Sequence, residues 1–444
     1  MRKFTLYSFI ITLAVLISPF ELSAQKTDSS IGMYSPYTFY GVGSLGYTAG
    51  TASDGMGGAS VAFRSFKRSN LVNPAAFSAV GQRSFLFEMG LAGLNMYSKQ
   101  RIDGQNRTTS NNMFNLGNVS VLLPITKGLG LGINVLPYSS VGYYTTRYED
   151  SDDVIADIGA VQYVYSGEGG ITQFKIGAGW EPFKGFSVGA EMIYLRGNID
   201  RTYNMNIIPY TGSGTYNGVS ASQNDKVSRI LGNFGVQYGF NIGSKNRLTL
   251  GAAYRLGGQL NADVTDYIPS GNIYGDTVRM DSYISDVRLP AVISAGLYYQ
   301  RPTFGIGFDY QYQNWADGNS YDAVNKVGYV NTSSYRLGAE YTPDRGSVRS
   351  FFKRVTYRAG VRYGDYYLSF DGHRLSERSV SIGFEIPFMM NTVSNVNVAF
   401  ELGKRGNAST LNRGLVLERF FRVNVGITLF GGDYDYWFVK YKYD

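Results

Sequence analysis

The 444-residue sequence contains no cysteine and one histidine, His373. The absence of cysteine excludes disulfide bonds and a lipid-modified N-terminal cysteine, and together the two counts exclude a His/Cys metal cluster. His373 follows Asp371-Gly372, so we expect it at a loop tip, where a lone imidazole is more typically solvated than paired with a nucleophile. We therefore expect no enzyme activity, no cofactor and no metal site.

Long apolar runs are absent after the first residues. Arg2 and Lys3 precede an apolar stretch, 4–20, that is interrupted by Pro19 and followed by the small-residue sequence ending at Ala24. This pattern predicts a secretory signal peptide, residues 1–24; the alternative, an anchor helix, is disfavoured because the run is short. No later stretch approaches the roughly 18 apolar residues of a membrane-spanning helix.

Charged residues are also scarce, at 17% of the chain, whereas Gly (55) and Tyr (37) are abundant. Low charge with many aromatics argues against intrinsic disorder and suits an antiparallel sheet protein. The net charge of +7 is scattered rather than gathered in runs, so we expect no nucleic-acid partner. Outer-membrane lipid and lipopolysaccharide, whose headgroups are anionic, are the partners that this dispersed charge favours.

Apolar residues alternate with small or polar ones along most of the chain from 83 onward, as in 304–313 and 421–429. A soluble sandwich would alternate too, but these strands are often ten or more residues long. The fold class predicted is all-β, a transmembrane antiparallel β-barrel of about 14 strands. The expected strands are 83–99, 112–126, 129–147, 168–183, 186–206, 227–242, 247–268, 285–300, 303–316, 331–343, 354–369, 376–388, 394–404 and 414–430.

The connections alternate in length, as in outer-membrane barrels with short periplasmic turns and long external loops. The long loops expected are 104–111, 150–160, 208–225, 269–281 and 316–326. We therefore predict the outer membrane of a Gram-negative bacterium as the location. The acidic loop around Glu149–Asp157 has oxygen ligands suited to Ca²⁺, although a solvated loop is the commoner outcome of such a sequence. In the tail 431–444, residues 434–443 could form a further strand, although fourteen strands are favoured over sixteen.

Residues 25–82 lack this alternation, and the sequence DGMGGAS at 54–60 and Asn73-Pro74-Ala75-Ala76 are rich in small residues. We predict that 25–82 forms an N-terminal plug, or hatch, in the lumen, and that 83–444 forms the barrel with a C-terminal tail. The plug and gating residues expected are Gly57, Gly58, Asn73, Pro74 and Ala75.

Charges of both signs fall on the strand face expected to point inward. Because no ring of one sign is evident, ion pairing that holds the plug is favoured over a selectivity lining for a polar solute. The lumen-lining residues expected are Glu191, Arg255, Asp309, Arg336, Glu340, Arg358, Arg362, Glu385, Glu401 and Arg422.

Pro137 falls inside the third predicted strand, followed by Tyr138-Ser139-Ser140. A proline cannot donate to a strand ladder, so it is expected at an edge, an end or a bulge. A simple bulge is one interpretation of Pro137. The other is a lateral opening of the wall, with Pro137, Ser139 and Ser140 at its edge.

The Gly57-Gly58-Ala59 and Asn73-Pro74-Ala75 sequences, followed by the first strand, resemble the hatch of the FadL/TodX family of outer-membrane transporters. Ser35-Pro36-Tyr37 and Trp437–Lys440 resemble the members of this family from Bacteroidetes. The resemblance implies fourteen strands, an N-terminal plug, uptake of a long-chain fatty acid or similar apolar molecule, and lateral release at a kink in the third strand.

Three functions remain open. Plug-gated passive uptake of a hydrophobic small molecule predicts a continuous apolar cavity from an external groove to Asn73, and a gap in the wall beside Pro137. A non-transporting barrel in a secretion or outer-membrane assembly complex predicts a sealed lumen and protein-binding loops at 208–225 and 269–281. A general diffusion porin would need an open aqueous lumen, against which the plug argues.

Overall fold

The computed structural model describes residues 33–46, 49–81, 84–102, 104–149, 151–152, 155, 159–208, 218–269, 277–279, 283–284, 287–323, 325–388 and 393–431. The expected signal peptide and the tail 432–444 lie outside this range, as do 209–217 and 270–276 in two of the expected long loops. No helix within the described residues has the length and apolar character that crossing a membrane requires.

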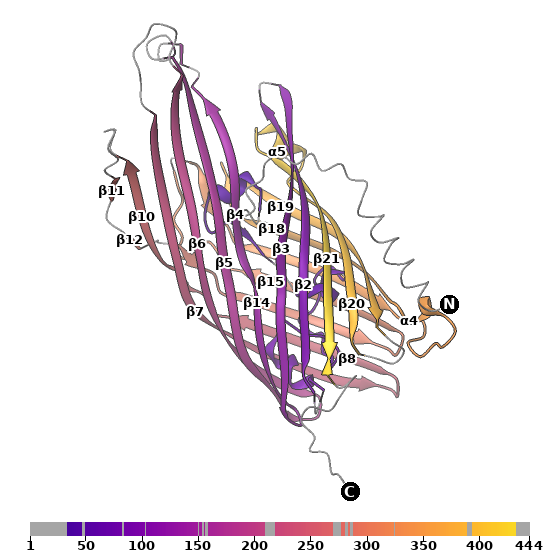
Figure 1. Ribbon diagram of the computed structural model, residues 1–444. Helices are drawn as coiled ribbons and strands as arrows, with labels where there is room; N and C mark the ends of the chain where they lie inside the picture. Colours follow the sequence, from indigo (N-terminus) through magenta and orange to yellow (C-terminus); the bar gives the residue numbers. More distant parts are fainter. Residues whose placement is uncertain are drawn as a thin grey trace. The chain divides into compact units, whose positions relative to one another are not determined.

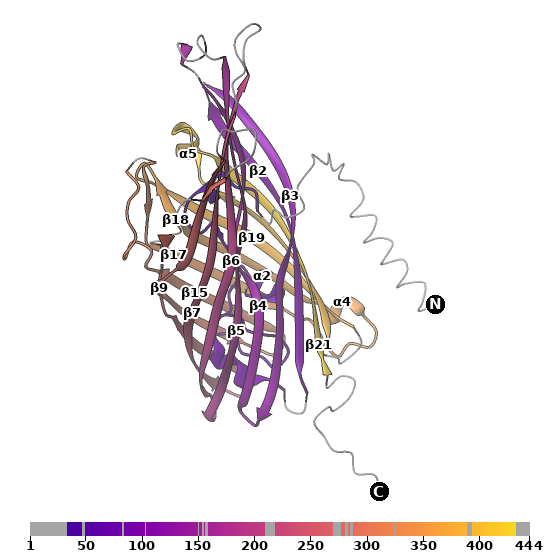
Figure 2. The ribbon, with the colours of Figure 1, turned by 60° about the vertical axis from the view of Figure 1, so that its left-hand side comes forward.

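The described strands form a closed antiparallel barrel of fourteen strands (Figures 1 and 2). The barrel closes where β2 pairs with β21, from Leu86↔Phe430 to Lys99↔Leu417. The wall strands are β2 (Leu86–Ile102), β3 (Gln105–Thr126), β4 (Leu129–Tyr148), β5 (Ala160–Phe183), β6 (Phe186–Ile208), β7 (Val219–Ile242), β8 (Asn246–Arg255), β14 (Val292–Gln300), β15 (Phe304–Gln313), β17 (Thr332–Tyr341), β18 (Thr356–Phe370), β19 (His373–Pro387), β20 (Asn395–Arg405) and β21 (Leu417–Phe430).

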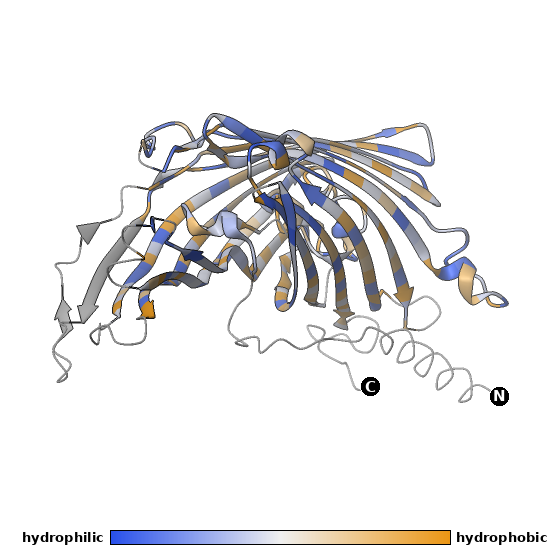
Figure 3. Ribbon diagram, turned by 90° about the horizontal axis from the view of Figure 1, so that it is seen from above, coloured by the Kyte–Doolittle hydropathy of each residue, from blue (hydrophilic) through white to orange (hydrophobic). Residues whose placement is uncertain are grey.

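Alternation fixes which face of each strand points outward. In β19, Val380 and Ile382 are more than half exposed, whereas Ser379, Ser381 and Glu385 are buried. The same alternation of apolar and polar residues colours the strands in Figure 3. An apolar outer face is what contact with lipid requires, and the pairing of β2 with β21 leaves no terminal edge strand in the wall. The barrel thus presents a lipid-compatible exterior and a polar interior.

Shorter elements complete the described chain. The short strands are β1 (Ser44–Leu45), β9 (Gly258–Gln259), β10 (Asn261–Pro269), β11 (Thr277–Arg279), β12 (Tyr283–Ile284), β13 (Arg288–Leu289) and β16 (Val327–Tyr329). The helices are η1 (Pro36–Phe39), α2 (Thr51–Asp54), η2 (Pro74–Ala79), α4 (Phe351–Arg354) and α5 (Ala408–Asn412). We call residues 33–81 the inner segment, because η1, β1, α2 and η2 all pack on the inner face of the wall.

The predicted strands agree with the wall in number and order; the strand expected at 186–206, for example, is β6. The loop expected at 104–111 was wrong, because β2 and β3 stay paired up to Ile102↔Gln105. Residues 105–111 are polar and mostly exposed, and a hairpin that faces water on both sides can keep its backbone hydrogen bonds without apolar side chains. The strand expected at 247–268 is also divided, between β8 and β10.

Most of the short connections, including those after β3, β5, β7 and β14, lie at one end of the barrel. Gly128 and Gly185 adopt φ of 77° and 91° in the turns after β3 and β5, a conformation that glycine adopts without strain. Short turns face the periplasm in outer-membrane barrels, so we call this end the periplasmic end. At the opposite end, Asp371 and Gly372 form the β18–β19 turn, and His373 is the first residue of β19 rather than part of a loop tip.

Candidate functional site

The inner segment lies directly against strand glycines of the wall. A Cβ added at Gly189 would lie 2.4 Å from the backbone of Pro74 and Ala75, and one at Gly251 would lie 2.5 Å from the Val61 carbonyl oxygen. Both distances are far below van der Waals contact. The other wall glycines in similar contact include Gly130, Gly179, Gly235, Gly338 and Gly360. The small-residue face of the strands is therefore the surface that receives the inner segment.

Asn73 joins the inner segment to two wall strands. Its side-chain oxygen accepts a hydrogen bond from the Ala75 amide (3.1 Å) and caps η2. Its side-chain nitrogen donates towards the carbonyls of Val61 (3.0 Å), Val236 (3.1 Å) and Ala252 (3.2 Å). Asn73 is fully buried, as is Ala75, and Pro74 occupies the first position of η2, where a missing N–H costs nothing.

Gly57 and Gly58 form a tight turn against β18. Both have positive φ, 68° and 84°, and a Cβ on Gly57 would lie 2.7 Å from the Val361 carbonyl oxygen. The Gly57 amide donates to Ser381 Oγ on β19 at 2.9 Å. Both the turn and the close approach require glycine.

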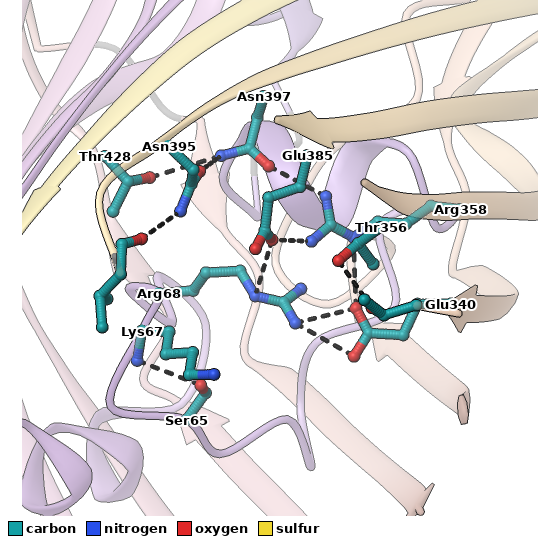
Figure 4. A network of polar contacts seen from close by, with 12 residues as sticks. Ser65, Lys67, Arg68, Glu340, Thr356, Arg358, Glu385, Asn395, Asn397 and Thr428 are labelled. Carbon is teal, nitrogen blue, oxygen red and sulfur yellow. Dashed lines mark hydrogen bonds and ion pairs between the residues drawn. The ribbon is translucent and has the colours of Figure 1, made fainter. Parts of the chain in front are cut away.

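One group of buried ion pairs, which we call the Arg68 cluster, links the inner segment to β17, β18 and β19 (Figure 4). Arg68 Nη2 lies 2.8 Å from Glu340, and Arg68 Nε lies 3.7 Å from Glu385. Arg358 bonds to both carboxylates, and Arg345 lies 3.1 Å from Glu385. The Arg68 guanidinium also stacks on Phe63, 4.3 Å from the ring centroid. Two carboxylates thus share three cations, one of which belongs to the inner segment.

A second group, the Arg405 cluster, spans β18 to β21. Its ion pairs join Arg405 to Glu377 and Glu418, Arg362 to Glu377 and Glu401, and Arg422 to Glu401, all between 2.8 and 2.9 Å. The inner segment reaches this cluster at three points: Ser35 Oγ donates to Glu418, Ser44 Oγ accepts from Arg405, and Asp54 accepts from Asn424.

The pKa of the Asp54 carboxyl group is raised above its usual value. Burial, together with the nearby Glu401 carboxylate, raises the pKa of Asp54 to about 7, against the lowering effect of Arg422 and Arg362. The side chain therefore changes charge in the physiological pH range, at the contact between α2 and β21.

The other expected inward residues also lie on the inner face. Asp309 accepts hydrogen bonds from the Ser60 and Val61 amides (2.6 and 2.8 Å). Glu191 pairs with Lys175 at 2.7 Å, and Lys175 also donates to the Leu71 carbonyl. Arg336 donates to Gln311 (2.9 Å), and Arg255 lies over the Tyr138 ring. Each of the ten charged residues expected from the sequence thus contacts either the inner segment or other side chains of the wall.

The wall separates where the third strand carries Pro137. The β3–β4 ladder runs only from Val119↔Val135 to Thr126↔Leu129, although β4 continues to Tyr148. Beyond this point β3 pairs with β2, and β4 with β5. The β4–β5 register shifts between Pro137 and Ser139, which is a β-bulge. We call the separation between β3 residues 105–118 and β4 residues 136–148 the seam.

The inner segment supplies the neighbour that β4 lacks at the seam. β1 pairs antiparallel with β4, Ser44↔Ser140 and Leu45↔Ser139. The Gly46 and Ser35 amides donate to the carbonyls of Tyr138 and Gly142, both at 2.8 Å. The backbone groups of β4 beside Pro137 are therefore satisfied by residues 35–46 rather than by β3.

An aromatic cluster encloses η1 at the end opposite the short turns. Trp315 and Tyr367 lie 4.5 Å apart between ring centroids, and Tyr37 and Phe370 lie 5.0 Å apart. Tyr367 donates to the Gly43 carbonyl at 2.7 Å, and Tyr37 donates to the Val416 carbonyl. This cluster fixes the start of the inner segment to the wall.

The interior cavities found between these contacts are small. One of about 150 Å³ is lined by polar residues such as Arg255 and Arg336, and one of about 120 Å³ lies at the seam, lined by apolar Met33, Leu94 and Phe420 together with charged residues of the Arg405 cluster. Ligand pockets are usually about 300–1,000 Å³, whereas an apolar cavity of about 150 Å³ accepts benzene. The seam cavity has room for about one small ring, not for an extended acyl chain.

Several contributors were missed from the sequence. Glu377 lies on the same face of β19 as Glu385, so strand alternation could have identified it. Arg68 and Asn70 lie in a segment without periodicity, and nothing in the sequence indicated their partners. Asn70 accepts from the amides of Val72 and Asn73 and donates to the Ser60 and Phe63 carbonyls, which shapes the loop before η2.

Among the described residues, no group of three or more His, Asp or Glu side chains is arranged to hold a metal ion. His373 contacts Thr410 Oγ1 at 3.1 Å. The acidic loop after Glu149 lies partly outside the described residues.

The barrel and the enclosed segment give the chain the fold of the FadL/TodX outer-membrane channels. Residues 6–444 match the family model BamG, and the chain belongs to the BamG family. Comparison of the sequence with curated proteins gave no match. The family assignment therefore rests on the family model, whereas the fold class rests on the similarity to solved structures.

Solved structures with this fold include the toluene transporter TodX of Pseudomonas putida, at 17% identity and a TM-score of 0.56 over 88% of this chain and 99% of that one. A FadL homologue of Pseudomonas aeruginosa gives 14% and 0.53 over 87% and 99%, and the Ralstonia pickettii toluene transporter TbuX gives 15% and 0.52 over 86% and 98%. At these identities the similarity establishes the fold. The Bacteroidetes resemblance stays a prediction.

Proposed function

We propose that this protein is a plug-sealed barrel subunit of an outer-membrane assembly complex. The observation that carries the proposal is that the inner segment is anchored to the wall along its length, from residue 35 to residue 79. The anchors are the contacts with wall glycines, Asn73, the Arg68 cluster, the Arg405 cluster and the aromatic cluster. A gate that moves in each transport cycle would have to break buried ion pairs, each costly to separate. A permanent seal needs no such movement.

The family name supports the same function, since BamG points to an assembly context. The small interior cavities agree with the sealed lumen expected of a non-transporting barrel. Of the loops expected to bind protein, 208–225 and 269–281, residues 209–217, 270–276 and 280–281 lie outside the described residues, and residues 219–225 form the start of β7.

The direct test is purification of the full chain, affinity-tagged, from its native membrane in a mild detergent, followed by mass spectrometry. Co-purification of other barrel-assembly proteins at fixed stoichiometry, with no conductance of the purified protein in planar bilayers, is expected. Recovery of the barrel alone, in a fraction that binds apolar molecules, would contradict the proposal. Membrane fractionation of the same culture tests the outer-membrane location and the Gram-negative origin.

A second candidate, uptake of a hydrophobic small molecule, is favoured by the seam. Pro137, Ser139 and Ser140 lie where β3 leaves β4, the seam cavity is partly apolar, and the solved structures with this fold are described as monoaromatic hydrocarbon channels or toluene transporters. In this function residues 33–46 would gate the seam and release the molecule laterally into the membrane.

Uptake of radiolabelled toluene and oleate by cells distinguishes the two functions. A transporter loses uptake when Gly46→Pro removes the amide that bonds to Tyr138 and alters the seam, whereas an assembly subunit shows no protein-dependent uptake before or after the change. Mass spectrometry of the purified barrel for bound lipid, lipopolysaccharide and fatty acid, repeated with Asn73→Ala, gives the matching binding data.

A further inference from the structure

The periplasmic end of the barrel contains a larger cavity of about 650 Å³. Three parts of the chain line it: the inner-segment loop 64–68, the β14–β15 turn at 300–304, and the β17–β18 connection at 342–346. Glu340 and Thr356, on the inner face of the wall, also line it, so the cavity lies inside the mouth rather than on the lipid-facing side.

Positive charge dominates this cavity. Its basic residues are Arg64, Lys67, Arg68, Arg247, Arg301 and Arg345, and its acidic residues are Glu340 and Asp344. Three of the cations are committed to carboxylates, Arg64 to Glu181, Arg68 to Glu340 and Arg345 to Glu385.

The other three cations, Lys67, Arg247 and Arg301, form no ion pair with a carboxylate of the described residues. Burial lowers the pKa of Lys67, and the positive charge of Arg345 lowers it further. The cavity therefore holds unneutralised positive charge in a partly enclosed space, where an anion is attracted more strongly than in bulk water.

Phe66 adds an apolar contact at the same place. It is 44% exposed, lines the cavity, and has Lys67 Nζ 5.3 Å from its ring centroid. Aromatic residues and arginine are enriched in protein–protein interfaces relative to the rest of the surface, so Phe66 offers an apolar contact suited to a protein segment. A free inorganic anion would make no use of the ring.

We propose that this mouth binds an acidic peptide segment of a periplasmic partner protein, with carboxylates at Lys67, Arg247 and Arg301 and an apolar side chain against Phe66. The inference rests on the proposed function, since it names the chemistry by which an assembly partner docks. Anionic phospholipid is the less suitable occupant, because most of the lining belongs to the inner segment, the two connections and inward residues such as Glu340, although Phe304 lies on the outward face of β15.

The test uses the purified full chain in detergent and fluorescein-labelled acetyl-hexaglutamate as the probe, measured by fluorescence anisotropy. The pocket variant is Lys67→Gln/Arg247→Gln/Arg301→Gln. The matched control is Lys127→Gln/Lys184→Gln/Lys245→Gln, which removes the same charge from exposed turns at the same end without touching the cavity. Heat-modifiable migration on gels confirms that both variants are folded.

We expect roughly ten- to hundredfold weaker binding for the pocket variant, because each of the three charges contributes a factor of roughly two to five, and less than a twofold change for the control. Raising NaCl to 0.5 M should weaken wild-type binding and abolish the difference between the two variants. An equal loss of peptide affinity in the pocket variant and the control would overturn the proposal. The proposal would also be overturned if the three substitutions weakened binding to phosphatidylglycerol vesicles more than they weakened binding to the peptide.

Co-purification separates this inference from the proposed function. If partner proteins no longer co-purify with the pocket variant but still co-purify with the control, both the docking site and the assembly function are supported. Full retention by the pocket variant overturns the docking site while the assembly function stands. Absence of partners from the wild-type preparation overturns the proposed function, whatever the peptide data show.

Discussion

Arg68→Gln should loosen the inner segment without unfolding the barrel. Arg68 is only 10% exposed in its side chain and contacts Glu340 at 2.8 and 3.0 Å. Removing one partner of a buried pair costs about 3–5 kcal/mol, and the lower value applies here because both carboxylates keep Arg358. The free energy for local opening of the inner segment should therefore fall by about 3 kcal/mol.

Native-state hydrogen exchange measures this opening directly. The Ser60 and Val61 amides, which donate to Asp309, report on the loop next to Arg68. A loss of about 3 kcal/mol accelerates their exchange roughly a hundredfold when reclosing is fast, whereas amides in the β19–β20 ladder should not change.

Lys184→Gln is the matched control, because Lys184 is an exposed cation in a turn at the same end of the barrel. Its variant should exchange like wild type. Exchange of Ser60 and Val61 within threefold of wild type in Arg68→Gln would refute the conclusion that the cluster holds the inner segment in place.

Three further results are expected. Gly189→Ala places a Cβ 2.4 Å from Pro74 and Ala75 and should lower the unfolding temperature, with a cost of about 1–3 kcal/mol, while Gly93→Ala, which meets only one atom at 3.9 Å, should not. Asn73→Ala removes the cap of η2 and the side-chain hydrogen bonds to β7 and β8, and should increase protease cleavage of the inner segment. Because the folded pKa of Asp54 is raised to about 7, its contribution is fully present below its unfolded pKa, near 3.8, and is lost as pH rises through 7. The protection factors of the α2 amides, which correct for the pH dependence of intrinsic exchange, should therefore be smaller at pH 8 than at pH 5. Asp54→Asn should abolish that dependence, and an unchanged pH profile in the variant would show that another group titrates.

Much of the wall could be predicted from the sequence. Alternation is a local property, and an antiparallel strand in lipid must place every second side chain outward, so the strands and the inward position of residues such as Glu340 and Asp309 follow from spacing alone. The failure at 104–111 has the same origin: polarity indicates exposure to water, but it does not indicate whether two strands remain paired there.

The sequence by itself determined a fourteen-strand barrel, its lipid-facing and inward faces, and a segment, 25–82, without the alternation of the wall strands. Only the tertiary structure decided what that segment does within the barrel. The partners of Arg68 lie 272 and 317 positions away along the chain, and Asn73 reaches carbonyls on β7 and β8. Such pairings follow from barrel closure, which brings distant residues together and leaves no signal in local spacing. For the seam, the sequence indicated only that Pro137 interrupts a strand. That residues 35–46, rather than β3, lie beside β4 there depends on contacts that exist only in the closed barrel.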